Sequence, residues 1–287
     1  MKNKLQVHPI FDTDSHTVTY IVWDPTTKQS AVIDSVLDYN HKNVETNTTL
    51  ADEVIAFIQD NNLENKWLLE THMHADHISA STYLQEKIGG KKAIGDQIVN
   101  VQTYLKEAFD LNEHFKTDGS QFDHLFADGE TFMIGTLPAK AVHTPGHTPA
   151  DMVFEIDGVL FTGDTLFAPD MGTARCDFPG GSADMMFDSV RTILESYSDE
   201  TKMYLCHDYP ENKNRELTYT ATVGEQRINN IHVNDTITKE AFISLREARD
   251  ATLDLPTYIF PAVQINGNAG TLTPGEFIKL SYNKKVL

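Results

Sequence analysis

The chain has 287 residues, of which 40% are hydrophobic, and a formal net charge of −19 at pH 7. This length allows one large domain or two small ones. The acidic excess argues against nucleic acid, whose phosphates need Lys and Arg to displace counterions, and against an anionic membrane surface. No apolar run approaches the roughly 18 residues of a membrane span. No apolar segment follows the N-terminal lysines either, so we expect a cytoplasmic protein.

The predicted elements of the first half alternate between strands and helices. Short strands are expected over residues 17–24 and 29–36, followed by a helix over 50–62 with apolar residues at helical spacing. The run KWLLET, residues 66–71, is typical of a buried strand and ends directly in a histidine-rich loop. A helix is expected next, over residues 79–90, closed by two glycines.

The second half continues the alternation. Residues 91–126 are polar and less periodic, which favours a helical insertion or lid. Further strands are expected over 130–135, 139–144, 151–156, 158–164 and 202–208, and helices over 182–196 and 238–253. A loop-rich tail follows from Pro256. This order predicts a layered α/β protein.

Metal-type residues follow the ends of four predicted strands. They are His72, His74, Asp76 and His77 in THMHADH, His147 in HTPGHTPAD, Asp164 in FTGDTLF, and His207 in YLCHDYP. Each motif alone also fits an ordinary turn or a hydrogen-bonded histidine, and His143 is interpreted in that way. The crowded loop is different, because several imidazoles and a carboxylate are costly to bury without a partner. Imidazole with carboxylate oxygen suits zinc, iron or manganese, so we predict a site for one ion or two.

The ordered set HxHxDH, H, D, H resembles the metallo-β-lactamase superfamily. The resemblance implies an αββα sandwich, a single domain with its metal at one edge and a C-terminal extension. It places the catalytic core in residues 1–215, with a polar insertion near 91–126, and a C-terminal helix and tail, residues 216–287, packed on that core. Asp34 falls where the superfamily has an early structural aspartate.

Two branches of the superfamily share these ligand positions. The glyoxalase II type holds two metal ions, zinc or iron, on all seven residues and hydrolyses a thioester. The persulfide dioxygenase type binds one Fe(II) and oxidises glutathione persulfide with O2 to sulfite and glutathione. Residues 161–181, FTGDTLFAPDMGTARCDFPGG, and the tail over 255–270 resemble a bacterial subgroup of the dioxygenases. Asp151 departs from the small or sulfur-containing residue that this subgroup leads one to expect.

The resemblance to the dioxygenases implies a role for each residue. His72, His147 and Asp164 would be the iron ligands, as in the facial triad of non-haem Fe(II) oxygenases. Four residues would be outer-shell groups or ligands of a second metal: His74, Asp76, His77 and His207. Arg175 and Tyr209 would contact the substrate, although Arg175 equally fits a salt bridge to Asp177, and Tyr209 also fits a packed aromatic.

The remaining expectations concern partners and alternatives. The resemblance implies a homodimer. A thioester hydrolase stays open as the alternative, and a non-catalytic metal or thiol sensor has less support. Cys176 and Cys206 are interpreted as small buried hydrophobic residues rather than redox groups.

Overall fold

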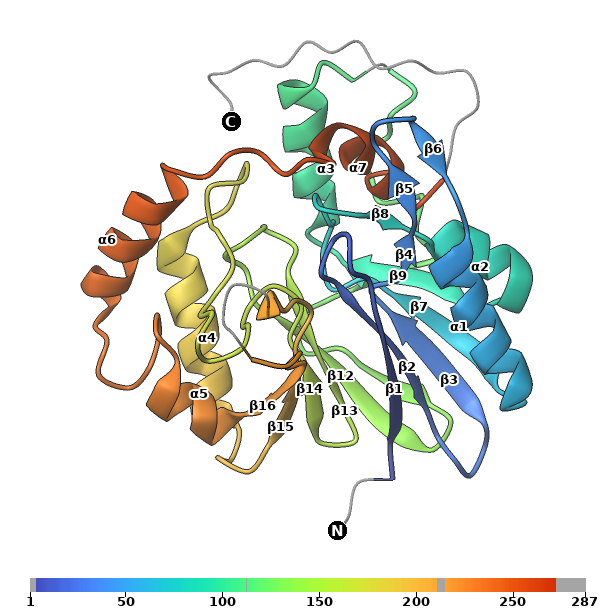
Figure 1. Ribbon diagram of the computed structural model, residues 1–287, viewed down its shortest axis with the longest axis horizontal. Coiled ribbons are helices and arrows are strands. Elements are labelled where there is room, and N and C mark those ends of the chain that lie inside the picture. The colour runs from blue at the N-terminus through green and yellow to red at the C-terminus, as the bar shows by residue number, and fades with distance from the viewer. Residues whose placement is uncertain (1–3, 112, 211–214, 272–287) are drawn as a thin grey trace.

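Two facing six-stranded sheets form the centre of the computed structural model, which describes residues 4–111, 113–210 and 215–271 (Figure 1). The first sheet runs in the order β1 (Gln6–Phe11), β2 (Val18–Trp23), β3 (Gln29–Ile33), β7 (Glu64–Leu69), β9 (Lys91–Gly95) and β10 (His124–Phe126). The second runs β11 (Thr131–Ile134), β12 (Leu137–His143), β13 (Met152–Ile156), β14 (Val159–Phe161), β15 (Lys202–Tyr204) and β16 (Thr220–Thr222). Two small pairs join β4 (Val36–Leu37) to β8 (Ile78–Ser79) and β5 (Tyr39–Asn40) to β6 (Glu45–Thr46).

Helices cover the outer face of each sheet (Figure 1). The first sheet packs against α1 (Thr49–Asp60) and α2 (Ser81–Ile88). The second packs against α4 (Ala183–Ser196) and α5 (Val223–Asn229), and α6 (Lys239–Asp250) packs on α4. Two further helices, α3 (Ile98–Ala108) and α7 (Ile259–Asn266), lie beside each other at one end of the sandwich. This layering confirms the predicted αββα sandwich.

The strands read as continuous apolar runs because both faces of each sheet are covered. In β2, Val18, Tyr20 and Val22 belong to the core between the two sheets. Ile21 points the other way and packs in the cluster that includes α1. Successive strand residues face opposite sides of a sheet, so a strand buried on both sides loses its polar alternation.

Two segments differ from their predicted structure. Residues 91–126, expected as a polar insertion or lid, contain β9, α3 and β10, and both strands pair in parallel within the first sheet. The tail, expected as loop, contains α7, whose Ile259, Ala262 and Val263 are buried. β9, β10 and α7 have 5, 3 and 8 residues, which is too short for a clear periodic signal.

The domain boundary near residue 215 stays a prediction. The structure places β16 at the edge of the second sheet, antiparallel to β15, and packs α6 against α4.

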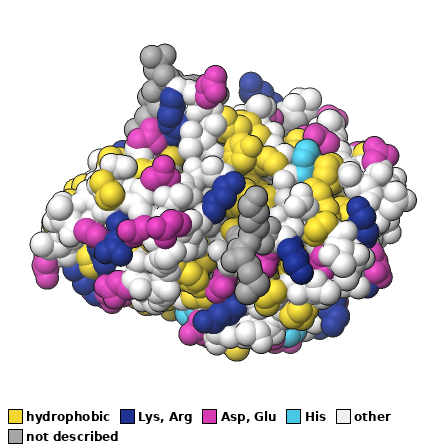
Figure 2. All heavy atoms as spheres, turned by 90° about the horizontal axis from the view of Figure 1, so that it is seen from below, with side chains coloured by type: hydrophobic (Ala, Val, Ile, Leu, Met, Phe, Trp, Pro, Cys, Tyr) yellow, Lys and Arg dark blue, Asp and Glu magenta, His cyan; other side chains and the backbone are white. Residues whose placement is uncertain are grey.

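Within the described ranges, no helix is both long and apolar enough to cross a membrane. On the face shown in Figure 2, basic and acidic side chains are interspersed rather than gathered by sign.

The strand ends bring the metal-type residues to one edge of the sandwich. β7 of the first sheet ends at Leu69, immediately before the histidine-rich loop. In the second sheet β12, β14 and β15 run in the same direction, so the segments that follow them share that edge. The sheets are tied together there by the bridge between Thr17 and His207 and by a bond from the Val18 N–H to the Cys206 carbonyl of 2.7 Å.

Asp24 links the two sheets at the opposite end from this edge. Its buried carboxylate accepts bonds from the Thr136 N–H and hydroxyl, both 2.8 Å, from the Thr26 N–H at 2.8 Å and from the Thr27 hydroxyl at 2.9 Å. Burial by itself would raise the pKa of Asp24, but these donors hold it below its usual value.

We expect Asp24→Ala to lower the free energy of unfolding by about 2–3 kcal/mol, because it leaves buried donors without an acceptor. Since the folded-state pKa is depressed, the stabilisation by Asp24 is present above the unfolded pKa of about 3.9 and is lost as the pH falls below it. Urea unfolding at pH 7 and pH 3 measures both effects. Equal midpoints for the two proteins at pH 7 would contradict this role.

Candidate metal centre

Asp34 shapes the loop that follows β7. It lies just after β3 with a φ of 51°, and its carboxylate accepts the Thr71 N–H at 2.7 Å and the Thr71 hydroxyl at 2.9 Å. The His74 Nε2 lies 3.0 Å from the same carboxylate and 3.3 Å from Glu70 Oε2. Burial opposes the charge of Asp34, but the His74 imidazole and the Thr71 donors keep the pKa of Asp34 below its usual value. The loop is therefore held at the strand end by a buried aspartate from the neighbouring strand.

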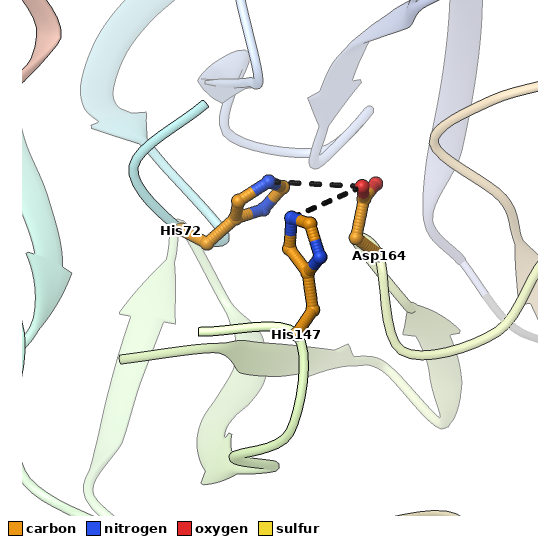
Figure 3. A group of neighbouring side chains, drawn as sticks. All are labelled: His72, His147 and Asp164. Carbon is orange, nitrogen blue, oxygen red and sulfur yellow. Dashed lines mark ion pairs between the residues drawn. The ribbon is translucent and has the colours of Figure 1, made fainter. Parts of the chain in front are cut away.

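Three of the predicted ligands converge in a first group, formed by His72, His147 and Asp164. Asp164 Oδ2 lies 3.9 Å from His72 Nε2 and 3.6 Å from His147 Nε2 (Figure 3). All three side chains are buried, and one ligand atom from each lies within 4.8 Å of the others. Burial, reinforced by the nearby His74 and His147, lowers the pKa of His72. The neutral imidazole that results is the form that binds metal ions.

The other four predicted ligands form a second group beside the first. His74, Asp76 and His77 each offer a ligand atom within 4.8 Å of the others. His207 Nε2 lies 3.3 Å from Asp76 Oδ2 and 3.3 Å from Asp164 Oδ1. Asp164 thus lies between the two groups, and the structure brings all seven predicted residues together.

Several imidazole nitrogens and carboxylate oxygens that face this centre make no hydrogen bond with another described residue. Among buried side-chain atoms without a hydrogen-bond partner in the described residues are His72 Nε2, His74 Nδ1, Asp76 Oδ2, His77 Nε2 and Asp164 Oδ1. Buried polar atoms are almost always hydrogen-bonded, so such a convergent set needs another partner. A cation satisfies imidazole nitrogens and carboxylate oxygens together. The residues present therefore fit one or two metal ions.

Contacts behind the ligands orient their rings. The Nδ1 of His147 donates to the Arg175 carbonyl at 2.7 Å, which leaves Nε2 facing Asp164. The Thr17 hydroxyl lies 3.2 Å from His77 Nδ1 and 3.5 Å from His207 Nδ1. Such partners set the tautomer and direction of a ligating histidine. Sequence reasoning missed Thr17, since a threonine in a strand carries no signal of this role.

A pocket of about 420 Å³ opens beside the centre. His147, Asp164 and His207 contribute to its polar side, and Phe167 and Phe178 contribute to its apolar wall. A concave site with apolar walls and a few convergent polar groups is the usual form of a small-molecule site. Tyr209, one of the predicted substrate contacts, also lines it.

Arg175 lines the same pocket, but its charge is already paired. Its Nε and Nη2 donate to the two carboxylate oxygens of Asp177 at 2.6 and 2.7 Å, and its Nη1 donates to the Asp254 carbonyl at 2.7 Å. The guanidinium carbon lies 5.1 Å from the centre of the Phe178 ring. The salt bridge that the sequence left open therefore forms, and the Arg175 backbone orients His147 as well.

α6 contributes two further arginines to the pocket that sequence reasoning did not single out. Arg246 is buried, pairs with Asp250 at 2.5 Å and donates to the Thr173 carbonyl at 3.2 Å. Arg249 is exposed on the pocket and makes no ion pair with another described residue. The helical spacing of these two residues is visible in the sequence, but nothing local shows where the helix packs.

Asp151 and the two cysteines are buried, and the Cys206 Sγ lies within 4.8 Å of ligand atoms of Asp164 and His207. Asp151 is buried and accepts bonds from the Thr148 N–H at 2.8 Å and the Thr148 hydroxyl at 2.6 Å, which closes the turn that carries His147. Burial raises the pKa of Asp151 to about 6. Cys176 and Cys206 are both buried, and burial raises the pKa of each thiol.

Comparisons with known proteins place this site in context. Residues 12–204 match the family described as the metallo-beta-lactamase superfamily. The chain is 46% identical to "Glyoxylase B2" of Dictyostelium discoideum over 99% of this chain and 97% of that protein. It is 43% identical to a probable metallo-hydrolase of Burkholderia pseudomallei over 98% of each chain. Persulfide dioxygenase ETHE1 of Mus musculus is 26% identical over 92% of this chain and 89% of its own. The crystal structure of ETHE1 from Myxococcus xanthus aligns with a TM-score of 0.73 and 27% identity, over 93% of this chain and 100% of that one.

Proposed function

The chain belongs to the metallo-beta-lactamase superfamily, and within it we propose that the protein is an Fe(II) persulfide dioxygenase. The proposed reaction converts glutathione persulfide, O2 and water into sulfite and glutathione. The observation that carries the proposal is the first group, in which two buried imidazoles and one carboxylate converge. This donor set is the one used by non-haem Fe(II) oxygenases. Because the hydrolase branch shares these three positions, the preference for the dioxygenase rests on the likeness to ETHE1 proteins in sequence and structure.

In this proposal His72, His147 and Asp164 hold one Fe(II) per chain. The ion, when bound, would supply the redox chemistry that joins O2 to the terminal persulfide sulfur. Contacts to the Nδ1 atoms of His147 and His72 fix the orientation of their rings. The Arg175 carbonyl holds the Nδ1–H of His147, and the Thr71 hydroxyl lies 3.0 Å from His72 Nδ1. Each ring then presents only its Nε2 to the ion.

The arginines that line the pocket support an anionic substrate. Of the arginines that line it, Arg175 and Arg246 are paired with carboxylates, whereas Arg249 makes no ion pair within the described part of the chain. We propose that Arg249 and the outer face of Arg175 attract the substrate carboxylates. Burial, together with the nearby Asp76 and Asp164, raises the pKa of Tyr209, so its phenol keeps the proton and can donate a hydrogen bond to anionic sulfur.

A dinuclear thioester hydrolase of the glyoxalase II type is the second candidate. Its support is the second group, because the Nδ1 of His74, the Nε2 of His77 and Oδ2 of Asp76 are buried without hydrogen bonds. Two of the relatives also carry the names glyoxylase and probable metallo-hydrolase. In this candidate the seven residues would hold two zinc or iron ions, and turnover would need no oxygen.

The deciding measurement follows dissolved O2 and sulfite after glutathione persulfide is added to protein that was loaded anaerobically with Fe(II). The proposal expects enzyme-dependent O2 loss in proportion to sulfite, with about one iron per chain. Folded, iron-loaded protein that consumes no O2 but hydrolyses glutathione thioesters would overturn it in favour of the hydrolase. Light scattering on the same preparation tests the homodimer that we also propose.

A further inference from the structure

Residues 266–270 at the end of α7, here called the α7 segment, pack directly on the loop of residues 72–79, which carries four of the candidate ligands. The side-chain amide of Asn266 donates to the carbonyls of His74 and His77, both at 2.8 Å, and its oxygen accepts the Ser79 N–H at 2.8 Å. Asn266 is 4% exposed. An asparagine amide has two N–H donors and one carbonyl oxygen, so every one of its groups contacts this loop.

The two carbonyls that Asn266 binds belong to His74 and His77, the first and last candidate ligands of the stretch 74–77. The carbonyls of His74 and His77 both point at one amide group, so the backbone between them must turn. That turn directs the side chains of His74, Asp76 and His77 toward the centre. Buried carbonyls in an irregular loop cannot pair within a helix or a sheet, and here Asn266 provides their donors.

Ser79 also contacts Glu70. Its hydroxyl donates to Glu70 Oε1, and Glu70 Oε2 lies 3.3 Å from His74 Nε2. Asn266 and Glu70 thus both hold the loop. Both contact His74, one through its backbone and the other through its ring.

The α7 segment is anchored independently of Asn266. The carbonyl of Ala269 accepts bonds from the hydroxyls of Ser81 at 3.2 Å and Thr82 at 2.8 Å. The Gly267 carbonyl accepts from the Gln102 amide at 2.9 Å. A change at residue 266 should therefore leave this segment in place and affect mainly the loop.

We propose that Asn266 is a positioning residue, which sets the geometry of the metal centre by holding the backbone of residues 74–77 and, with it, the side chains of His74, Asp76 and His77. In the dinuclear candidate His74, Asp76 and His77 are ligands. In the iron candidate they lie beside the ligands, with the His74 ring centre 4.1 Å from that of His72. The inference therefore rests on a metal at this centre and not on which reaction it serves. Changes to groups that orient metal ligands typically weaken metal affinity by about 10–100-fold.

The test compares Asn266→Asp with Asn268→Asp in protein loaded with Co(II) as the probe ion. Asn266→Asp keeps the shape and the acceptor for the Ser79 N–H but removes both donors. Asn268 lies on the same segment, and its side chain makes no hydrogen bond with another described residue, so it is a matched control. Chelator competition gives the Co(II) affinity, and visible absorption reports the ligand geometry.

We expect the affinity of the Asn266→Asp protein to fall by about 10–100-fold with altered absorption bands, while Asn268→Asp matches the parent. Asn266→Ala, which adds no buried charge and leaves room for water, should show the same direction and covers the case in which the aspartate variant fails to fold. A purely structural role would lower the thermal midpoint of the metal-free protein and leave affinity and spectrum unchanged. That outcome would overturn the inference, whatever the oxygen measurement shows.

Discussion

Replacing Asp164 with asparagine is expected to lower kcat/KM by about 10³-fold and to reduce bound metal. Its Oδ2 lies 3.6 Å from His147 Nε2 and 3.9 Å from His72 Nε2, and its Oδ1 lies 3.3 Å from His207 Nε2, so its carboxylate is close to residues of both groups. Asparagine keeps the shape but removes the charge that balances a cation. Metal catalysis contributes several kcal/mol to barrier lowering, and about 4 kcal/mol corresponds to 10³-fold. Elemental analysis and turnover measure the two effects. Wild-type metal content and turnover would contradict them.

The matched pair His72→Ala and His77→Ala separates one metal from two. In the proposed iron site, His72→Ala loses the ion, whereas His77→Ala keeps about one iron per chain because His77 lies in the second group. In a dinuclear hydrolase, His77→Ala protein would drop from two ions to one. Metal content of both variants under the same loading conditions decides between the two arrangements.

Replacing Arg246 with alanine is the second change with a large expected effect, about 3–5 kcal/mol in the free energy of unfolding. Arg246 is 2% exposed, and its loss would leave the buried carboxylate of Asp250 without its cation. Asp250 also accepts the Cys176 N–H at 2.8 Å. The ion pair between Arg246 and Asp250 therefore attaches α6 to residues 173–176, part of which lines the pocket. A buried charge without its partner is far more costly than a pair that was never formed.

Urea unfolding of the metal-free protein measures this effect, and Arg249→Ala is its control. Arg249 lies on the same helix but is exposed and unpaired among the described residues, so its removal should change stability by less than about 0.5 kcal/mol. In the dioxygenase assay Arg249→Ala should instead raise KM for glutathione persulfide. Similar unfolding midpoints for the two variants would contradict the buried-pair argument.

Local patterns in the sequence determined most of the architecture and the composition of the site. The apolar runs over β2, β3, β7 and β13 predicted strands at nearly the observed positions, and amphipathic spacing predicted α1, α4 and α6. The seven candidate ligands can be identified in the sequence because they follow strands and because such a cluster is costly without a cation. The superfamily followed from the order of those motifs, and the match over residues 12–204 confirms it.

The tertiary structure alone decided how these residues are grouped and what holds them. Residues 72 and 147 share a group with Asp164, while His74 turns its Nε2 to Asp34 and Glu70. These contacts join residues far apart in the chain, and some of them use backbone carbonyls, which every residue has. The bond between Asn266 and the His74 carbonyl is one example. The pairing of Arg175 with Asp177 and the packing of α7 likewise depend on three-dimensional neighbours. Periodicity and spacing report how a residue relates to its own segment, and only folding brings distant segments into contact.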